Sequence, residues 1–198
     1  MVENMADFDA AFDKVIVGHE GGYVNDKNDF GGETYCGISR RYHPSWSGWV
    51  IIDKYKKDPH FPDILYIDIY LNNEVRQFYK EYYWDVNLLD EITSQDIADE
   101  LFDIGVNMGI RRATKFLQEA INYLNKCGTI CNDLSVDGIM GPNTLKALSK
   151  IILYRGVVYV FKVLNILQGC HYCDEMKKNP SQEKYAYGWF DRVTFIKQ

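Results

Sequence analysis

The chain has 198 residues and a formal net charge of −6 at pH 7, with 46% hydrophobic and 25% charged residues. That length can bury a substantial core in one or two compact domains. An acidic balance without a basic stripe argues against a protein that holds nucleic acid through its phosphates.

The first twenty residues carry acidic side chains where a secretion signal has basic ones, and they include no long apolar run. No later segment reaches the roughly 18 apolar residues of a membrane-spanning helix. The longest candidate, Ile151 to Leu167, is interrupted by Arg155 and Lys162. We therefore expect synthesis in the cytoplasm without a signal peptide, so that action outside the cell would need a separate route of release.

Five cysteines are present, and an odd number without an export signal makes a disulfide framework improbable. Cys127 with Cys131 and Cys170 with Cys173 form two closely spaced pairs, of which the second has the common zinc-ligand spacing. We expect free thiols that fill small apolar gaps, with a four-thiolate zinc site as the alternative.

The first predicted element is a helix over Asp7 to His19, because its apolar residues recur on one face and Asp7 or Asp9 can cap its start. The Gly-Gly pair at 21–22 should end this helix, since glycine readily takes the left-handed conformation found there. Residues 21 to about 60 follow no sustained period and hold most of the turn-forming residues, so we expect short strands or an irregular hairpin.

Helical patterns return after this region, and no internal repeat or low-complexity linker separates them. The sequence therefore predicts a mainly α fold with a small irregular or β-containing lobe around residues 21–60. The further predicted helices are Asn72–Tyr83, Ser94–Met108, Arg111–Lys126, Asn143–Leu153, Val157–Leu167 and Gln182–Phe195.

Glu20 lies at the last turn of the first predicted helix, directly before two glycines. The partial negative charge of a helix C-terminus disfavours a carboxylate, and burial would act in the same direction, so the pKa of Glu20 should be raised. A carboxyl that stays protonated near neutral pH can act as a general acid, and the glycines leave room for a bulky ligand. The alternative is a surface glutamate beside a glycine helix stop.

Asp29 and Thr34 follow Glu20 at a spacing that suits sugar chemistry. Cleavage of a glycosidic bond needs a proton for the leaving oxygen and a group that steadies or attacks the anomeric carbon. Glu20 and Asp29 provide such a pair, and the Thr34 hydroxyl can orient the attacking water. Glu33 is a rival for the second carboxylate. In the alternative, Asp29 only organises a turn and Thr34 is a strand residue.

These residues also carry a family resemblance. The spacing Glu20-x8-Asp29-x4-Thr34 is similar to that of phage lysozymes, one residue shorter at its end. The residue pattern around these positions resembles more closely the glycoside hydrolase family 108 N-acetylmuramidases, which are also described as secretion activators and are related to phage endolysins. The residues that carry this resemblance are Glu20-Gly21-Gly22-Tyr23 and Asp29-x-Gly31-Gly32-x-Thr34-x-x-Gly37-Ile38-Ser39.

The resemblance continues along nearly the whole chain and implies two regions. Residues 1–109 would form a lysozyme-like catalytic region and residues 110–198 a helical peptidoglycan-binding region, both packed into one compact unit. The downstream residues that carry it are Phe102-Asp103-x-x-Val106-Asn107-x-Gly109, Ala113-x-x-x-Leu117-Gln118, Asp137-Gly138-x-x-Gly141-Pro142-x-Thr144 and Tyr185-x-x-Gly188-Trp189-x-x-Arg192-Val193.

The resemblance implies a lysozyme-like helical fold in which Glu20 is the catalytic acid and Asp29 a second catalytic group, with Thr34 in support. One departure concerns the turn: the family usually has proline after this aspartate, where this chain has Phe30. Proline would stiffen the turn, so its absence affects the placement of Asp29 and not that of Glu20.

Substrate-binding residues are predicted from side-chain type. Tyr23, Tyr35, Trp46 and Trp49 can stack on sugar rings, although core packing is the common use of such residues. Asn107 stands between Gly105 and Gly109 and can reach into a cleft, with a helix C-cap as the alternative.

The leading hypothesis is a muramidase that cleaves the β-1,4 bond between N-acetylmuramic acid and N-acetylglucosamine in peptidoglycan. No cofactor or metal is expected, because acid–base chemistry suffices. A holin-like pore would release the protein to the cell wall. The alternatives are a non-catalytic cell-wall-binding or secretion and lysis accessory protein on the same scaffold, and a lytic transglycosylase. The oligomeric state stays open.

Overall fold

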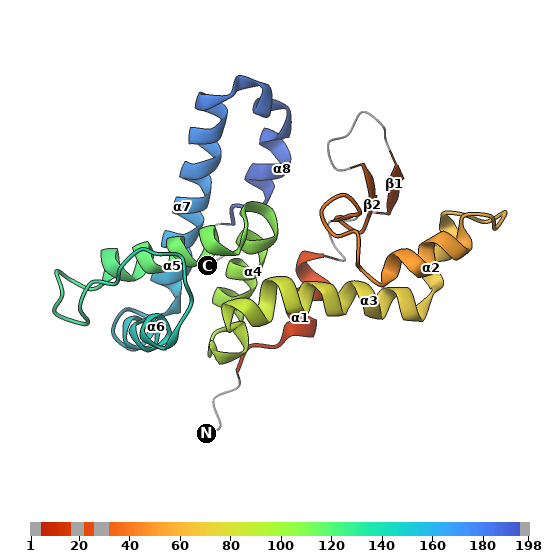
Figure 1. Cartoon of the computed structure of the whole chain (residues 1–198). Helices are drawn as coiled ribbons and strands as arrows, with labels where there is room; N and C mark the ends of the chain where they lie inside the picture. Colours follow the sequence, from red (N-terminus) through yellow and green to blue (C-terminus); the bar gives the residue numbers. More distant parts are fainter. Residues whose placement is uncertain (1–4, 17–21, 26–31, 195–198) are drawn as a thin grey trace. The chain divides into compact units, whose positions relative to one another are not determined.

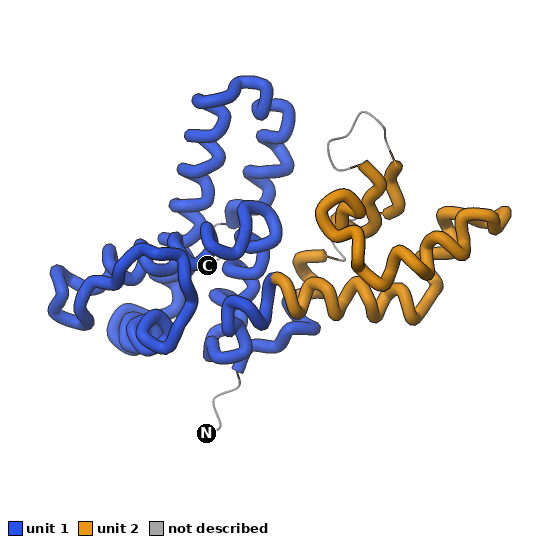
Figure 2. Tube along the Cα trace, viewed as in Figure 1, with its two compact units in different colours: residues 1–11, 83–198 blue, residues 12–82 orange. Residues whose placement is uncertain are grey.

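The computed structural model describes residues 5–16, 22–25 and 32–194. Glu20 and Asp29, on which the catalytic hypothesis depends, lie outside these residues. Chain contacts divide the protein into two compact units (Figure 2). Residues 12–82 form what we call the sheet unit, and residues 1–11 with 83–198 form the helical unit.

The sheet unit holds a three-stranded antiparallel sheet in the order β1-β2-β3 (Figure 1). Tyr23 on β1 pairs with Tyr35 on β2, and Thr34 on β2 pairs with Ser39 on β3. This confirms the predicted β-containing lobe. The strands are β1 (Tyr23–Asn25), β2 (Glu33–Tyr35) and β3 (Ile38–Ser39).

Two helices follow the sheet, α2 (Gly48–Tyr55) and α3 (Ile69–Tyr79). Helix α2 was not predicted, because eight residues are too few to show a clear helical period. Burial of Trp49 and Ile52 stabilises it instead. Helix α3 begins three residues before its prediction, since the Asp68 carboxylate accepts a hydrogen bond from the Leu71 amide at 2.8 Å and caps the helix.

Helix α1 (Phe8–Val15) confirms the start of the first predicted helix. The Asp7 carboxylate caps it by accepting a hydrogen bond from the Ala10 amide at 2.8 Å. In the helical unit, Phe8 packs edge-to-face against Trp84 and Phe102, with ring centroids 5.6 and 5.9 Å apart. These buried rings join the start of the chain to its later helices.

The helical unit contains α4 (Gln95–Met108), α5 (Ile110–Leu124), α6 (Pro142–Arg155), α7 (Val157–Lys178) and α8 (Ala186–Asp191). The predicted α4, α5 and α6 are confirmed. Helix α7 runs eleven residues beyond its predicted end, because the single glycine within it, Gly169, costs only about 1 kcal/mol and does not end the helix. The predicted helix over Gln182–Phe195 is wrong in extent: a 3₁₀ turn, Pro180–Tyr185, precedes the short α8.

An ion pair links α4 to the end of the helical unit. The Arg192 guanidinium lies 2.5 Å from the Asp103 carboxylate, and both side chains are mostly buried. Gln168 on α7 donates a hydrogen bond to the second Asp103 oxygen at 3.2 Å. Asp103 and Arg192 come from the first and the last of the four downstream resemblance segments, so this contact gives both residues a structural role.

A second polar link fixes the loop between α5 and α6. The Gln118 side chain donates to the Asp137 carboxylate at 2.8 Å and accepts from the Gly138 amide at 2.9 Å. Gly138 has a φ of +74°, and a Cβ placed there would lie 2.7 Å from the Arg111 carbonyl oxygen. Only glycine fits this position without displacing the α5 backbone.

Among the described residues no single helix is long and apolar enough to cross a membrane. Helices α6 and α7 meet that test only as a pair, and the pair is bent by 116° at its break.

Gly138→Ala should lower the free energy of unfolding of the protein by about 2 kcal/mol or more, because alanine meets both a left-handed backbone and a backbone oxygen. Urea unfolding followed by circular dichroism measures this. Gly188→Ala is the matched control, since Gly188 lies in α8 with open space around a new Cβ. Equal stability of the two variants would contradict the role given to Gly138.

Candidate functional site

The sheet unit presents the sequence-predicted residues on two faces of its sheet. Alternate residues of a strand point to opposite faces, so Thr34 points away from its neighbours Glu33 and Tyr35. Thr34 is half-buried, and its hydroxyl donates a hydrogen bond of 3.3 Å to the Gly32 carbonyl. Its cross-strand partners are Val24 and Ser39. The Thr34 hydroxyl thus stands on a face separate from the charged groups described next.

On the other face, Tyr23 contacts Glu33. The Tyr23 hydroxyl donates a hydrogen bond of 2.9 Å to a Glu33 carboxylate oxygen, and the Tyr23 ring packs edge-on against Phe61. Burial raises the pKa of Tyr23, and so does the neighbouring Glu33 carboxylate. Tyr23 is therefore held as a protonated donor, half-buried at the edge of the sheet.

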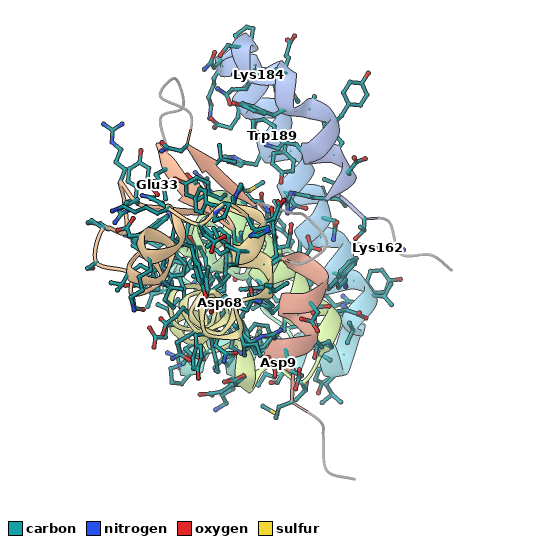
Figure 3. The ribbon with its side chains drawn as sticks, turned by 90° about the vertical axis from the view of Figure 1, so that its right-hand side faces the viewer. Asp9, Glu33, Asp68, Lys162, Lys184 and Trp189 are labelled. Atoms are coloured by element: carbon teal, nitrogen blue, oxygen red, sulfur yellow. The ribbon has the colours of Figure 1, made fainter. Side chains whose placement is uncertain are left out.

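Glu33 is the centre of a four-residue ion cluster, which we call the Glu33 cluster (Glu33, Arg40, Asp53 and Lys56). Arg40 lies 2.9 Å from one Glu33 oxygen and Lys56 lies 2.7 Å from the other. Both cations also contact Asp53, at 2.5 and 2.7 Å. Figure 3 labels Glu33 on the sheet. The cluster ties β2, the segment after β3 and the C-terminal end of α2 together.

The cluster fixes the protonation of its acids. Burial would raise the pKa of Glu33, but the hydrogen bonds from Lys56, Arg40 and Tyr23 outweigh it, and its net pKa lies below the ordinary value. Hydrogen bonds from Arg40 and then Lys56 hold the pKa of Asp53 far below its ordinary value. A carboxylate held ionised in this way cannot supply the proton that glycosidic cleavage needs. Glu33, the rival for the second carboxylate, is also bound through both of its oxygens by Arg40 and Lys56, so its charge is neutralised and it has a structural role.

Two predicted substrate-binding residues stand apart from this arrangement. Tyr35 is only 1% exposed, and its hydroxyl donates a hydrogen bond of 3.2 Å to the Leu65 carbonyl. Its ring is thus part of the core of the sheet unit and offers no surface to a sugar. Asn107 belongs to the helical unit, where its exposed side chain donates to the Asp103 carbonyl one turn earlier, at 2.9 Å. Asn107 therefore lies within the last turn of α4, and the C-cap position of the alternative is held by Gly109 instead.

Sequence reasoning missed Arg40, Asp53 and Lys56. Asp53 and Lys56 stand three residues apart at the end of α2, a spacing that brings side chains together only on a helix. Because α2 itself was not predicted, the spacing of Asp53 and Lys56 did not indicate that their side chains meet.

The described residues contain no group of three or more histidine, cysteine or acidic side chains placed to hold a metal ion. All five cysteines are free thiols. Burial raises the pKa of the Cys36 thiol to about 11, so this cysteine beside the sheet stays protonated at neutral pH.

The chain is similar to known proteins over almost its whole length. Residues 14–109 match the family model described as Glycosyl hydrolase 108, and residues 112–194 match the one described as Predicted Peptidoglycan domain. These matches confirm the resemblance found in the sequence and indicate a cell-wall-related function. No curated protein sequence matches the chain.

Among solved structures the chain is similar to one titled "Structure of Brucella abortus SagA". The TM-score is 0.60 at 22% sequence identity, and the match covers 94% of this chain and 88% of that one. A likeness at this identity concerns the fold, and it confirms the predicted mainly α, lysozyme-like architecture.

Glu33→Gln should lower the free energy of unfolding at pH 7 by about 1–2 kcal/mol, because charge-assisted hydrogen bonds from Arg40 and Lys56 are lost. A group whose pKa is depressed by folding stabilises the protein above its unfolded pKa. The difference between wild type and variant should therefore shrink as the pH falls below about 4.3, the ordinary glutamate value.

Thermal unfolding of both proteins between pH 3 and 7 measures this difference. The matched control is Glu183→Gln, at an exposed glutamate in the helical unit, for which no such pH-dependent difference is expected. If the Glu33→Gln protein is as stable as wild type at pH 7, the result would contradict the structural role of the Glu33 cluster.

Proposed function

We propose that the protein is a muramidase of peptidoglycan, because residues 14–109 match the family model described as Glycosyl hydrolase 108. It would cleave the β-1,4 bond between N-acetylmuramic acid and N-acetylglucosamine. The match of residues 112–194 to a peptidoglycan domain supports the same polymer as the ligand.

Glu20 would donate a proton to the glycosidic oxygen, and Asp29 would stabilise the oxocarbenium-like transition state or orient water. The observation that carries this assignment is the Glu33 cluster. Its ion pairs engage both Glu33 oxygens with cations, which disfavours Glu33 as the second carboxylate that steadies the anomeric carbon. Of the carboxylates that the sequence analysis singled out, Glu20 and Asp29 then remain for the chemistry.

Thr34 would help to orient the attacking water molecule. Strand alternation directs its hydroxyl to the sheet face opposite the Glu33 carboxylate, so it is not drawn into the ion cluster. A threonine hydroxyl can donate one hydrogen bond and accept two, which suits the positioning of a water molecule. The mechanism needs only acid–base groups and no cofactor.

The deciding experiment compares wild type with Glu20→Gln on purified peptidoglycan, with the released products identified by mass spectrometry. Wild type should release fragments that end in reducing N-acetylmuramic acid. Glu20→Gln should lose at least about 100-fold in rate, because an amide cannot donate the proton. Glu183→Gln is the control with a wild-type rate.

Two other outcomes separate the alternatives. Anhydro-muramic acid ends that still depend on Glu20 would make the protein a lytic transglycosylase. Absence of products from wild type, with wall binding intact, would favour the non-catalytic wall-binding or secretion accessory protein.

Asp29→Asn should lower kcat by about 100-fold, since removal of one group that stabilises transition-state charge has an effect of that size. Initial rates of glycan release at saturating peptidoglycan measure this. Asp63→Asn, at an exposed aspartate of the sheet unit, provides the comparison. A wild-type rate for Asp29→Asn would leave Glu20 as the sole catalytic carboxylate.

A further inference from the structure

A hollow of about 560 Å³ opens on the sheet unit between the segment after β3 and helix α3. Residues 42–47 form one wall, and the opposite wall carries side chains of α3 and of the turn that continues it. That continuation, Lys80–Trp84, is a π-helical turn, a distortion often found at functional sites. The volume lies in the range of pockets that hold small ligands.

Trp46 forms a rigid aromatic wall of this hollow. Its indole N–H donates a hydrogen bond of 3.3 Å to the Glu74 carbonyl, and its ring packs edge-on against Trp49 at 5.2 Å. The ring also lies directly on Gly48, where an added Cβ would come within 2.3 Å of it. Trp46 is nevertheless only half-buried, so part of its ring faces solvent in a fixed orientation.

Tyr82 provides a second aromatic surface. Its ring stacks on Phe78 with centroids 4.7 Å apart, and His43 packs edge-on against both rings. Tyr82 is still 53% exposed. A single exposed tyrosine needs no explanation, but an exposed ring and a half-buried ring that are both fixed by packing in one hollow form a prepared apolar surface.

The polar groups of the hollow include two carboxylates, Glu74 and Glu81. The Glu74 carboxylate accepts a hydrogen bond from the Ser47 hydroxyl, and the Gln77 amide donates to Glu81 at 2.6 Å. Within the described part of the chain, no lysine or arginine lines the hollow. Each carboxylate has further lone pairs that can accept hydrogen bonds from a ligand.

These features select the chemistry of the ligand. Two carboxylates without a lysine or arginine beside them repel the carboxylates of wall peptides, so an anionic ligand is disfavoured. A pyranose ring has an apolar C–H face that packs on aromatic rings and hydroxyls that donate to carboxylate and amide oxygens. The combination of fixed rings and acceptors therefore suits a neutral sugar.

We propose that this hollow binds a neutral N-acetylhexosamine unit of the glycan strand, with Trp46 and Tyr82 against the ring and Glu74 and Gln77 on its hydroxyls. The inference rests on the proposed function for its polymer. Trp49 joins the hollow to the Glu33 cluster, since it packs against Trp46 and lies 5.1 Å beneath the Arg40 guanidinium.

The test is a titration of the full-length Glu20→Gln protein with the neutral tetramer of N-acetylglucosamine, followed by calorimetry and by the Trp46 indole N–H signal in NMR. That signal should shift on binding. Tyr82→Ala and Gln77→Ala should each weaken binding at least about fivefold, the loss expected for one stacked ring or one good hydrogen bond. Neither substitution removes a contact that orients Trp46.

Tyr187→Ala is the matched control, because Tyr187 is 90% exposed on α8 of the helical unit. Binding that is equally weakened by Tyr187→Ala, or unchanged by Tyr82→Ala and Gln77→Ala, would overturn the proposal. So would preference for a lysine-containing wall peptide over the tetramer, with affinity that falls as salt is added, since that identifies an ammonium ligand.

This assay does not depend on catalysis. If the tetramer binds in the hollow while the wild-type protein releases no products, the result would contradict the proposed muramidase function and support the sugar site. If cleavage depends on Glu20 but the tetramer does not bind in the hollow, the result would contradict only the proposed sugar site.

Discussion

The half-buried carboxylate of Glu33 is the constraint on which the sheet unit depends. Three strands of two or three residues cannot hold a sheet together through backbone hydrogen bonds alone. Glu33 adds a hydroxyl from β1, a guanidinium from the segment after β3 and an ammonium from the end of α2. A carboxylate removed from water requires such partners. Because Arg40 also lies over Trp49, the same contacts orient the aromatic wall of the hollow beside α3.

The cation contacts of Glu33 also distinguish a structural carboxylate from one that could act as a proton donor in catalysis. A carboxylate whose oxygens are both engaged by cations stays ionised, which suits a structural link and excludes proton donation. The two faces of β2 carry out different tasks as a result. Glu33 and Tyr35 serve the cluster and the core, whereas Thr34 keeps its hydroxyl on the opposite face.

Helical periodicity predicted α4, α5 and α6, because long amphipathic segments identify themselves by the spacing of their buried residues. It failed for α2, whose eight residues are stabilised by tertiary burial of Trp49. It also failed for the end of α7, which continues through Gly169 to Lys178. The Glu33 cluster was beyond sequence reasoning for a different reason. Its members lie on three elements whose approach depends on the folded arrangement and not on local spacing.

The residues that carry the family resemblance divide by the contacts they make. Asp103 and Arg192 form a mostly buried ion pair, and Gln118 with Gly138 fixes the loop before α6, so these residues maintain the fold whether or not the protein is an enzyme. A relative can therefore keep most of the resemblance and lose the chemistry. Glu20 and Asp29 take part in neither of these two structural contacts. Substitutions at these two residues therefore test whether the protein is a muramidase or a wall-binding scaffold.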